Sequence, residues 1–242
     1  MTASHQNFKS ISSKLVPFVN TVGVYFILFL PSDEPSLFSM LIKCLPILSL
    51  MVYVILHGIS LQPKYSMSRR ILLGLMFSCL GDALLVWPNY FLEGMLSFGV
   101  AQLMYISAFD LKPLNLDVGV ILYVISALGL TILRRNLTGV FQVGVPIYTF
   151  LLTTMTWRTI ARLDIKQGCW LRYVTCIGGI LWLVSDGLLG FHLFYTPLPY
   201  SQLFIMGTYY MGQLGIALSV SEQQPCPSPS PTLVNKPAHL VQ

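Results

Sequence analysis

Apolar stretches of about 20 residues recur along the whole chain and limit what it can fold into. A helix needs about 20 predominantly apolar residues to cross the hydrocarbon core of a bilayer. Charged residues make up only 10% of the 242 residues and hydrophobic residues 55%, whereas a soluble domain carries about 25% charged residues. We therefore predict an all-α, polytopic membrane protein with eight transmembrane helices. The predicted spans are 15–31, 36–56, 71–88, 91–109, 116–133, 139–157, 171–192 and 201–220.

The segments outside these spans are short, so we expect one membrane domain at 15–220, preceded by residues 1–14 and followed by a tail at 221–242. The tail holds five prolines and no apolar periodicity, which is typical of a disordered segment. Most of the 14 Lys and Arg residues fall on the side of the N-terminus, whereas Arg134 and Arg135 lie on the opposite side. Because basic loops face the cytosol, we predict that both termini are cytosolic.

Two aspartates stand inside predicted spans, and their surroundings are alike. Asp82 lies in GDALL at 81–85, and Asp186 lies in SDGLL at 185–189. An aspartate at the centre of a membrane helix costs about 2.5–3.5 kcal/mol on insertion scales, so it normally faces a protein interior or a wet cavity and has a function. The matched segments predict two carboxylates in one site. A repeat of spans 1–4 and 5–8, a 4+4 arrangement, would explain the match and stays open at this point.

Other polar side chains in the spans are candidates for supporting these acids. Lys43 is either the counter-ion of an aspartate or a ligand for a lipid phosphate, or it extends to the membrane interface. Glu93 either belongs to the site or lies at the interface as an acid in the first turn of a helix. The remaining candidates form two helical stripes, Gln102 with Tyr105 and Tyr209 with Gln213, and Tyr210 lies beside the second stripe.

The spacing of cysteine and histidine argues against a metal site. Five cysteines and four histidines are scattered without a CxxC pair or a histidine cluster, so we predict neither a metal nor another cofactor. The net charge of +5 comes from basic residues near the ends of spans. It therefore does not indicate nucleic-acid binding.

Several segments together resemble the YhhN-type family of membrane proteins, and among its members most closely the animal lysoplasmalogenases. The segments are Lys43-Cys44-Leu45-Pro46, Gly81-Asp82, Trp87-Pro88 with Phe91-Leu92-Glu93-Gly94-Met95, Phe98 to Phe109, Ser185-Asp186 and Thr208-Tyr209-Tyr210. The similarity runs from about residue 14 to 221. It implies an eight-span protein of the endoplasmic reticulum that hydrolyses the vinyl-ether bond of lysoplasmalogens. The products would be a fatty aldehyde and glycerophosphoethanolamine or glycerophosphocholine, and the motif aspartates would be Asp82 and Asp186.

Gln102 departs from the pattern of this family, whose members commonly carry histidine at that position. A glutamine amide can hold a water molecule or a phosphate oxygen, but it cannot take a proton at neutral pH. We therefore assign no proton transfer to Gln102.

Vinyl-ether chemistry suits two carboxyl groups. The bond hydrolyses through protonation at carbon, and water then traps an oxocarbenium ion like that of glycosidases. One aspartate must be protonated and the other ionised, and the sequence leaves the assignment open. The expected partners are a lysophospholipid substrate and membrane lipid, with the oligomeric state open. The alternative is a proton-coupled transporter of a lipid or small molecule, which uses intramembrane acids equally well.

Overall fold

The computed structural model describes residues 2–28, 35–163 and 170–223, with side chains from residue 11 onward. In these ranges the chain forms eight α-helices, three 3₁₀ turns and no strand. The helices are α1 (Thr2–Leu28), α2 (Leu37–Leu56), α3 (Ser66–Leu84), α4 (Phe91–Phe109), α5 (Leu116–Leu133), α6 (Phe141–Ala161), α7 (Trp170–Phe194) and α8 (Ser201–Leu218). The 3₁₀ turns are η1 (Pro63–Tyr65), η2 (Pro88–Tyr90) and η3 (Ser219–Gln223).

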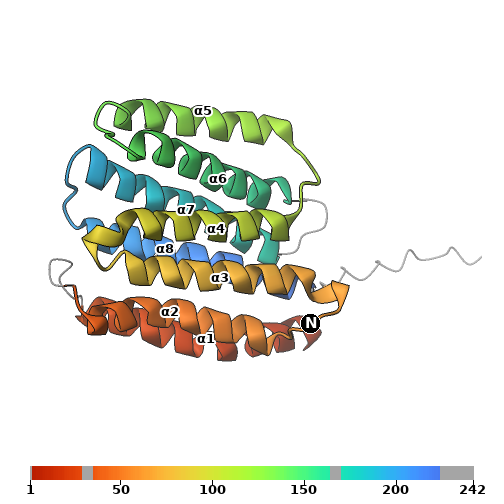
Figure 1. Cartoon of the computed structure of the whole chain (residues 1–242). Helices are drawn as coiled ribbons and strands as arrows, with labels where there is room; N and C mark the ends of the chain where they lie inside the picture. The colour runs from red at the N-terminus through yellow and green to blue at the C-terminus, as the bar shows by residue number, and fades with distance from the viewer. Residues whose placement is uncertain (1, 29–34, 164–169, 224–242) are drawn as a thin grey trace, which may run out of the picture.

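The helices lie side by side with their axes along one common direction (Figure 1). Helices α1 and α2 form one edge of the bundle and α5 and α6 the opposite edge, with α3, α4, α7 and α8 between them (Figure 1). Each helix that carries one of the two aspartates packs most extensively on the helix that follows it, α3 on α4 and α7 on α8. Helix α2 contacts α3 and α8, and α6 contacts α4 and α7, so each central pair is joined to both edges of the bundle.

Each predicted span coincides with one helix, although some of the helix ends differ. Helix α1 begins at Thr2, well before the predicted start of the first span, and residues 29–31 of that span lie outside the described residues. Six of the helices are long and apolar enough to cross a membrane, and α3 and α6 are not among them. Helix α3 carries Arg69, Arg70 and Asp82, and α6 is rich in threonine. These polar residues lower the hydropathy of the two helices.

Close packing between α7 and α8 depends on glycine. A Cβ atom added at Gly178 would lie 2.8 Å from the Cα atom of Gly215 and 2.9 Å from the carbonyl oxygen of Gly212. Both neighbours are backbone atoms, which cannot turn away as a side chain can. Small residues at such interfaces let two helix backbones approach closely in a membrane. The contact lies two turns before Asp186 on α7, so it fixes the distance from that helix to α8.

The change Gly178→Ala is therefore expected to destabilise the protein. Forcing an extra methyl group into a packed interface costs about 1–3 kcal/mol, which should appear as a lower unfolding temperature in detergent. The matched control is Gly129→Ala in α5, where an added Cβ would meet no atom within 4 Å. Alanine favours helix there, so its unfolding temperature should stay the same or rise slightly. Equal effects of the two changes would contradict the backbone contact.

Buried charged residues tie the end of α6 to neighbouring segments. Arg158 donates hydrogen bonds to two backbone carbonyls of the α4–α5 loop, one of them that of Asp110 at 2.7 Å. Arg162 pairs with Glu222 at 2.8 Å, and the Thr175 hydroxyl donates to the same carboxylate at 2.6 Å. Because Glu222 belongs to η3, the first three residues of the predicted tail pack on the bundle. The rest of that tail, 224–242, lies outside the described residues.

Candidate active site

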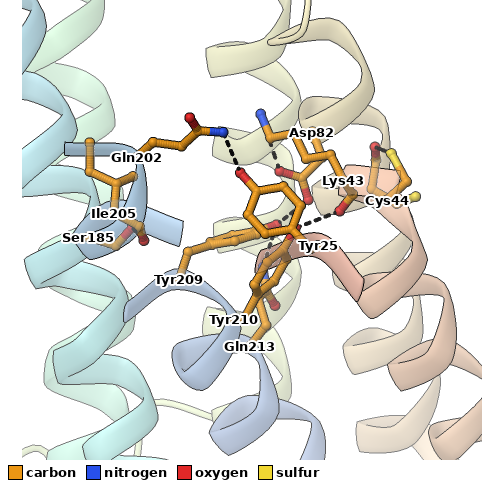
Figure 2. Close-up of polar contacts among 11 residues, drawn as sticks. Tyr25, Lys43, Cys44, Asp82, Ser185, Gln202, Ile205, Tyr209, Tyr210 and Gln213 are labelled. Carbon is orange, nitrogen blue, oxygen red and sulfur yellow. Dashed lines mark hydrogen bonds and ion pairs between the residues drawn. The ribbon is translucent and has the colours of Figure 1, made fainter. Parts of the chain in front are cut away.

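Asp82 lies two residues before the end of α3 and is almost completely enclosed, with 2% of its surface exposed. The Tyr209 hydroxyl of α8 donates a hydrogen bond to its Oδ2 atom at 2.6 Å. The Lys43 ammonium of α2 lies 3.9 Å from its Oδ1 atom. Figure 2 shows these three side chains converging from three different helices. The carboxylate therefore has one cationic and one hydroxyl partner.

A chain of hydrogen bonds continues from Tyr209 into the core. The Gln213 amide nitrogen donates to the Tyr209 hydroxyl oxygen at 3.3 Å, and the Tyr105 hydroxyl donates to the Gln213 amide oxygen at 3.1 Å. Ser78 lies 3.4 Å from the Tyr105 hydroxyl, and both groups are buried. Because Tyr209 accepts from Gln213, its own proton points to Asp82. The network thus fixes the orientation of the hydrogen bond that reaches the carboxylate.

Lys43 is held beside Asp82 through its backbone. The Tyr210 hydroxyl of α8 donates to the Lys43 carbonyl at 2.9 Å, and the Tyr210 ring packs edge-on against Tyr25 of α1 (Figure 2). The side chain of Lys43 is 17% exposed, so the ammonium group lies mostly inside the bundle. Of the alternatives for this lysine, the geometry favours the counter-ion of Asp82.

Asp186 of α7 has a different environment. The Tyr148 hydroxyl of α6 donates a hydrogen bond to its Oδ2 atom at 2.5 Å. Asp186 is partly exposed, whereas Asp82 is buried. Among the described residues no lysine or arginine forms an ion pair with Asp186. Each acid therefore accepts a hydrogen bond from its own tyrosine. The two acids differ in solvent exposure, and only Asp82 has a cation beside it.

Trp182 connects the two acid–tyrosine pairs. It lies one helical turn before Asp186, and its ring centroid is 6.2 Å from that of Tyr209, the partner of Asp82. The Tyr105 ring lies at 5.4 Å on the same indole. The arrangement places two carboxyl groups on either side of one aromatic cluster.

Polar atoms of Gln102 and Trp182 are buried in this cluster without a hydrogen bond. Within the described part of the chain, neither the amide atoms of Gln102 nor the indole nitrogen of Trp182 has a partner, and both side chains have no exposed surface. Leaving such a group unpaired costs about 1–3 kcal/mol.

The chemistry of the cluster is that of acids, phenols and amides. In the described ranges no group of three or more His, Cys, Asp or Glu side chains could hold a metal ion. Two carboxyl groups with tyrosine partners can hold and transfer protons, and Lys43 can stabilise a negative charge. These groups together can carry out general acid–base catalysis.

The chain matches the model of the YhhN family over residues 38–220. It belongs to the YhhN family. Lysoplasmalogenase TMEM86A of Bos taurus is 41% identical to this YhhN protein over 220 residues, which cover 89% of this chain and 92% of the relative. The human protein of the same name is 39% identical with the same coverage. Lysoplasmalogenase TMEM86B of Sus scrofa is 40% identical over 210 residues, 86% of each chain. No solved structure gives a significant match.

Most of the residues singled out in the sequence of this YhhN protein meet in space. Around Asp82 the structure brings together Lys43, Tyr105, Tyr209, Tyr210 and Gln213. Gln102 is buried in the adjoining cluster. Glu93 does not join them, because its side chain is exposed in the first turn of α4.

Two residues of this candidate site, Tyr148 and Trp182, were not predicted as site residues from the sequence. Tyr148 is one of 12 tyrosines, and nothing in its neighbourhood along the chain marks it as the partner of Asp186. Trp182 carried a signal, because it precedes Asp186 by four residues and so lies on the same face of a helix.

Proposed function

We propose that this protein is a lysoplasmalogenase that hydrolyses the vinyl-ether bond of lysoplasmalogens. The products are a fatty aldehyde and glycerophosphoethanolamine or glycerophosphocholine. The proposal is supported by the names of relatives that share about 40% of its residues over most of the chain. The structural observation that supports the proposed reaction is the pair of aspartates on either side of Trp182, each hydrogen-bonded to a tyrosine. Paired carboxyl groups are the groups that handle an oxocarbenium ion in glycosidases.

The different surroundings of the two aspartates support different roles. Asp82 has an ammonium group 3.9 Å away, and an opposite charge favours the ionised carboxylate. Asp186 has a hydroxyl donor on one oxygen and no cation in an ion pair among the described residues, so no positive charge holds it in the ionised form. Asp186 is also the more accessible of the two. We therefore assign the acid to Asp186 and the ionised base to Asp82.

The proton and bond changes follow from this assignment. Asp186 gives its proton to the alkenyl carbon that does not bear oxygen, and the positive charge develops on the adjacent carbon and ether oxygen. Water adds to that carbon and gives a proton to Asp82, which leaves a hemiacetal. The bond from this carbon to the glycerol oxygen then breaks. Asp82 returns its proton to that oxygen, and the hemiacetal hydroxyl gives its proton to Asp186, so both acids regain their starting states.

The membrane arrangement proposed with this function has eight spans. Helices α3 and α6 complete the bundle between apolar neighbours, which can shield their polar residues from lipid. A 4+4 repeat is supported by the contacts, because α2 packs on α8 as α6 packs on α4. The same number of residues separates Asp82 from Asp186 and Tyr105 from Tyr209. From the distribution of Lys and Arg we place both termini in the cytosol, and from the family resemblance we place the protein in the endoplasmic reticulum.

Aldehyde release by the purified protein in detergent tests the function. A lysoplasmalogen should be cleaved, whereas the matched lipid with a saturated alkyl ether should not, because it has no alkenyl carbon to accept the proton. Detergent micelles provide no second compartment, so turnover there cannot come from a transporter. No aldehyde from protein that remains folded would contradict the proposal, and proton-coupled uptake into vesicles would then support the alternative.

Tyr148→Phe tests the partner of the proposed acid. The change removes one hydrogen bond to a carboxyl group, a contact worth about 1.5–3 kcal/mol when charged groups take part, and we expect turnover to fall by about 10-fold or more. Tyr123→Phe is the control, because the Tyr123 hydroxyl bonds Thr154 at 2.6 Å on the far side of α6, in the contact with α5. Equal turnover of the two variants would show that Tyr148 does not act on Asp186.

A further inference from the structure

The most unusual polar atoms in the core are those of Gln102 in α4 and Trp182 in α7. Both side chains have no exposed surface. The amide oxygen and nitrogen of Gln102 and the indole nitrogen of Trp182 all lack a hydrogen-bond partner among the described residues. Buried polar groups in folded proteins nearly always have a partner, so each such group points to a ligand or a bound water.

These two side chains lie between the two acid–tyrosine pairs. Trp182 touches the ring of Tyr209, the partner of Asp82, at a centroid distance of 6.2 Å. On its other side, the Trp182 indole nitrogen lies near the Asp186 carboxylate but not in the geometry of a hydrogen bond. Gln102 lies one turn before Tyr105 on α4, and its amide lies near the Tyr148 hydroxyl, again without the geometry of a hydrogen bond. The unpaired atoms therefore lie near Asp186 and near Tyr209, the hydroxyl partner of Asp82.

The unpaired atoms define what they can bind. The indole N–H and the amide N–H donate hydrogen bonds, and the amide oxygen accepts one. None of them carries charge, and among the described residues no lysine or arginine forms an ion pair with the neighbouring Asp186, so nothing here would neutralise a phosphate group. A small neutral group that both accepts and donates fits all three atoms. A buried water molecule typically makes about three hydrogen bonds of this kind.

We infer that Gln102 and Trp182 hold the water molecule that attacks the oxocarbenium ion. This inference rests on the proposed hydrolysis and deepens it, because it assigns the site of the second reactant. The water oxygen accepts from Trp182 and from the Gln102 amide nitrogen, and one water proton is donated to the Gln102 amide oxygen. When the oxygen bonds to the cationic carbon, the other proton passes to Asp82. Gln102 and Trp182 exchange no proton and act by orientation.

The first test reads the hydrogen bond of Trp182 directly and needs no turnover. Ultraviolet resonance Raman spectra report whether an indole N–H is hydrogen-bonded, and the difference between wild type and Trp182→Phe isolates this residue. In substrate-free protein we expect a hydrogen-bonded N–H that shifts towards the unbonded position in Gln102→Leu. An unbonded N–H in the wild type would overturn the inference, even if the protein releases aldehyde and even if Gln102→Leu does not fold.

The second test uses methanol as a competing nucleophile. When methanol traps the cation, the product is a mixed acetal in place of the aldehyde. If Gln102 and Trp182 orient water, Gln102→Leu and Trp182→Phe should lower kcat about 10–100-fold, leave KM almost unchanged and raise the share of mixed acetal. Trp157→Phe is the matched control, because that indole donates to the Asn115 carbonyl at 3.0 Å, outside the cluster.

The outcomes separate the two claims. If the wild type releases no aldehyde, the proposed function fails, and the Raman spectrum still decides whether the pair binds a small polar molecule. If the wild type is active but both variants keep the control's kcat and product ratio, the water site is wrong while the hydrolysis stands. A rise in KM with unchanged kcat would also overturn the inference, because it would assign the pair to substrate binding.

Discussion

Asp186→Asn is expected to lower aldehyde release by about 10²–10⁴-fold, the usual contribution of a general acid. Asparagine keeps the size of the side chain and can still accept the Tyr148 hydrogen bond, but it has no acidic proton to give to carbon. Because Asp186 has no ion-pair partner among the described residues, the variant should fold as stably as the wild type. Initial rates of aldehyde release and the unfolding temperature in the same detergent measure the two effects.

The matched control is Asp117→Asn, which changes an exposed carboxylate in the first turn of α5. It makes the same chemical change and should leave turnover within about 2-fold of the wild type, because Asp117 is exposed and makes no contact with the residues of the cluster in the described part of the chain. Near-normal turnover of the Asp186 variant would make that aspartate structural and would refute the two-carboxyl mechanism.

Asp82→Asn should lower aldehyde release as much as Asp186→Asn does. It should, in addition, destabilise the protein. It leaves the Lys43 ammonium without its carboxylate inside the bundle. Removing one partner of a buried ion pair costs about 3–5 kcal/mol, and we expect the lower end because Lys43 keeps 17% exposure. The unfolding temperature should therefore fall in Asp82→Asn and stay unchanged in Asp186→Asn.

Adding Lys43→Met to Asp82→Asn separates stability from catalysis. Methionine removes the unpaired charge and keeps most of the apolar side chain, so the double variant should regain most of the lost stability. It should remain inactive, because the base is still absent. Lys64→Met in the exposed η1 turn is the control for loss of a lysine and should change neither property. If the second change does not restore stability, the unpaired charge of Lys43 is not the cause of the loss of stability in Asp82→Asn.

The eight helices and their approximate positions were predictable, because each apolar stretch must satisfy its own backbone hydrogen bonds in lipid. The aspartates were predictable for the same reason, since a carboxylate within such a stretch is costly and stands out. Glu93 illustrates the limit of this reasoning. It lies so close to the start of a span that an interfacial and a buried position look alike in the sequence, and the structure places it exposed in the first turn of α4.

The partners of the acids were harder to predict than the acids themselves. Tyr209 stood out because Gln213 follows it by one turn, which places two polar groups on one face. Tyr148 has no such neighbour, and its role appears only once α6 packs beside α7. Which side chains meet across two helices depends on their rotation and depth, and a single apolar sequence specifies neither.

The attachment of α5 has a practical consequence for purification. Of its residues only Gly119 is buried, and it is joined to α6 by hydroxyl pairs such as Ser126–Thr153 at 2.7 Å and by the Trp157–Asn115 contact. Hydrogen bonds of this kind hold helices together where water is excluded. A short-chain detergent that admits water along this seam should therefore release α5 first. We expect long-chain detergents or lipid nanodiscs to extend the half-life of the purified protein.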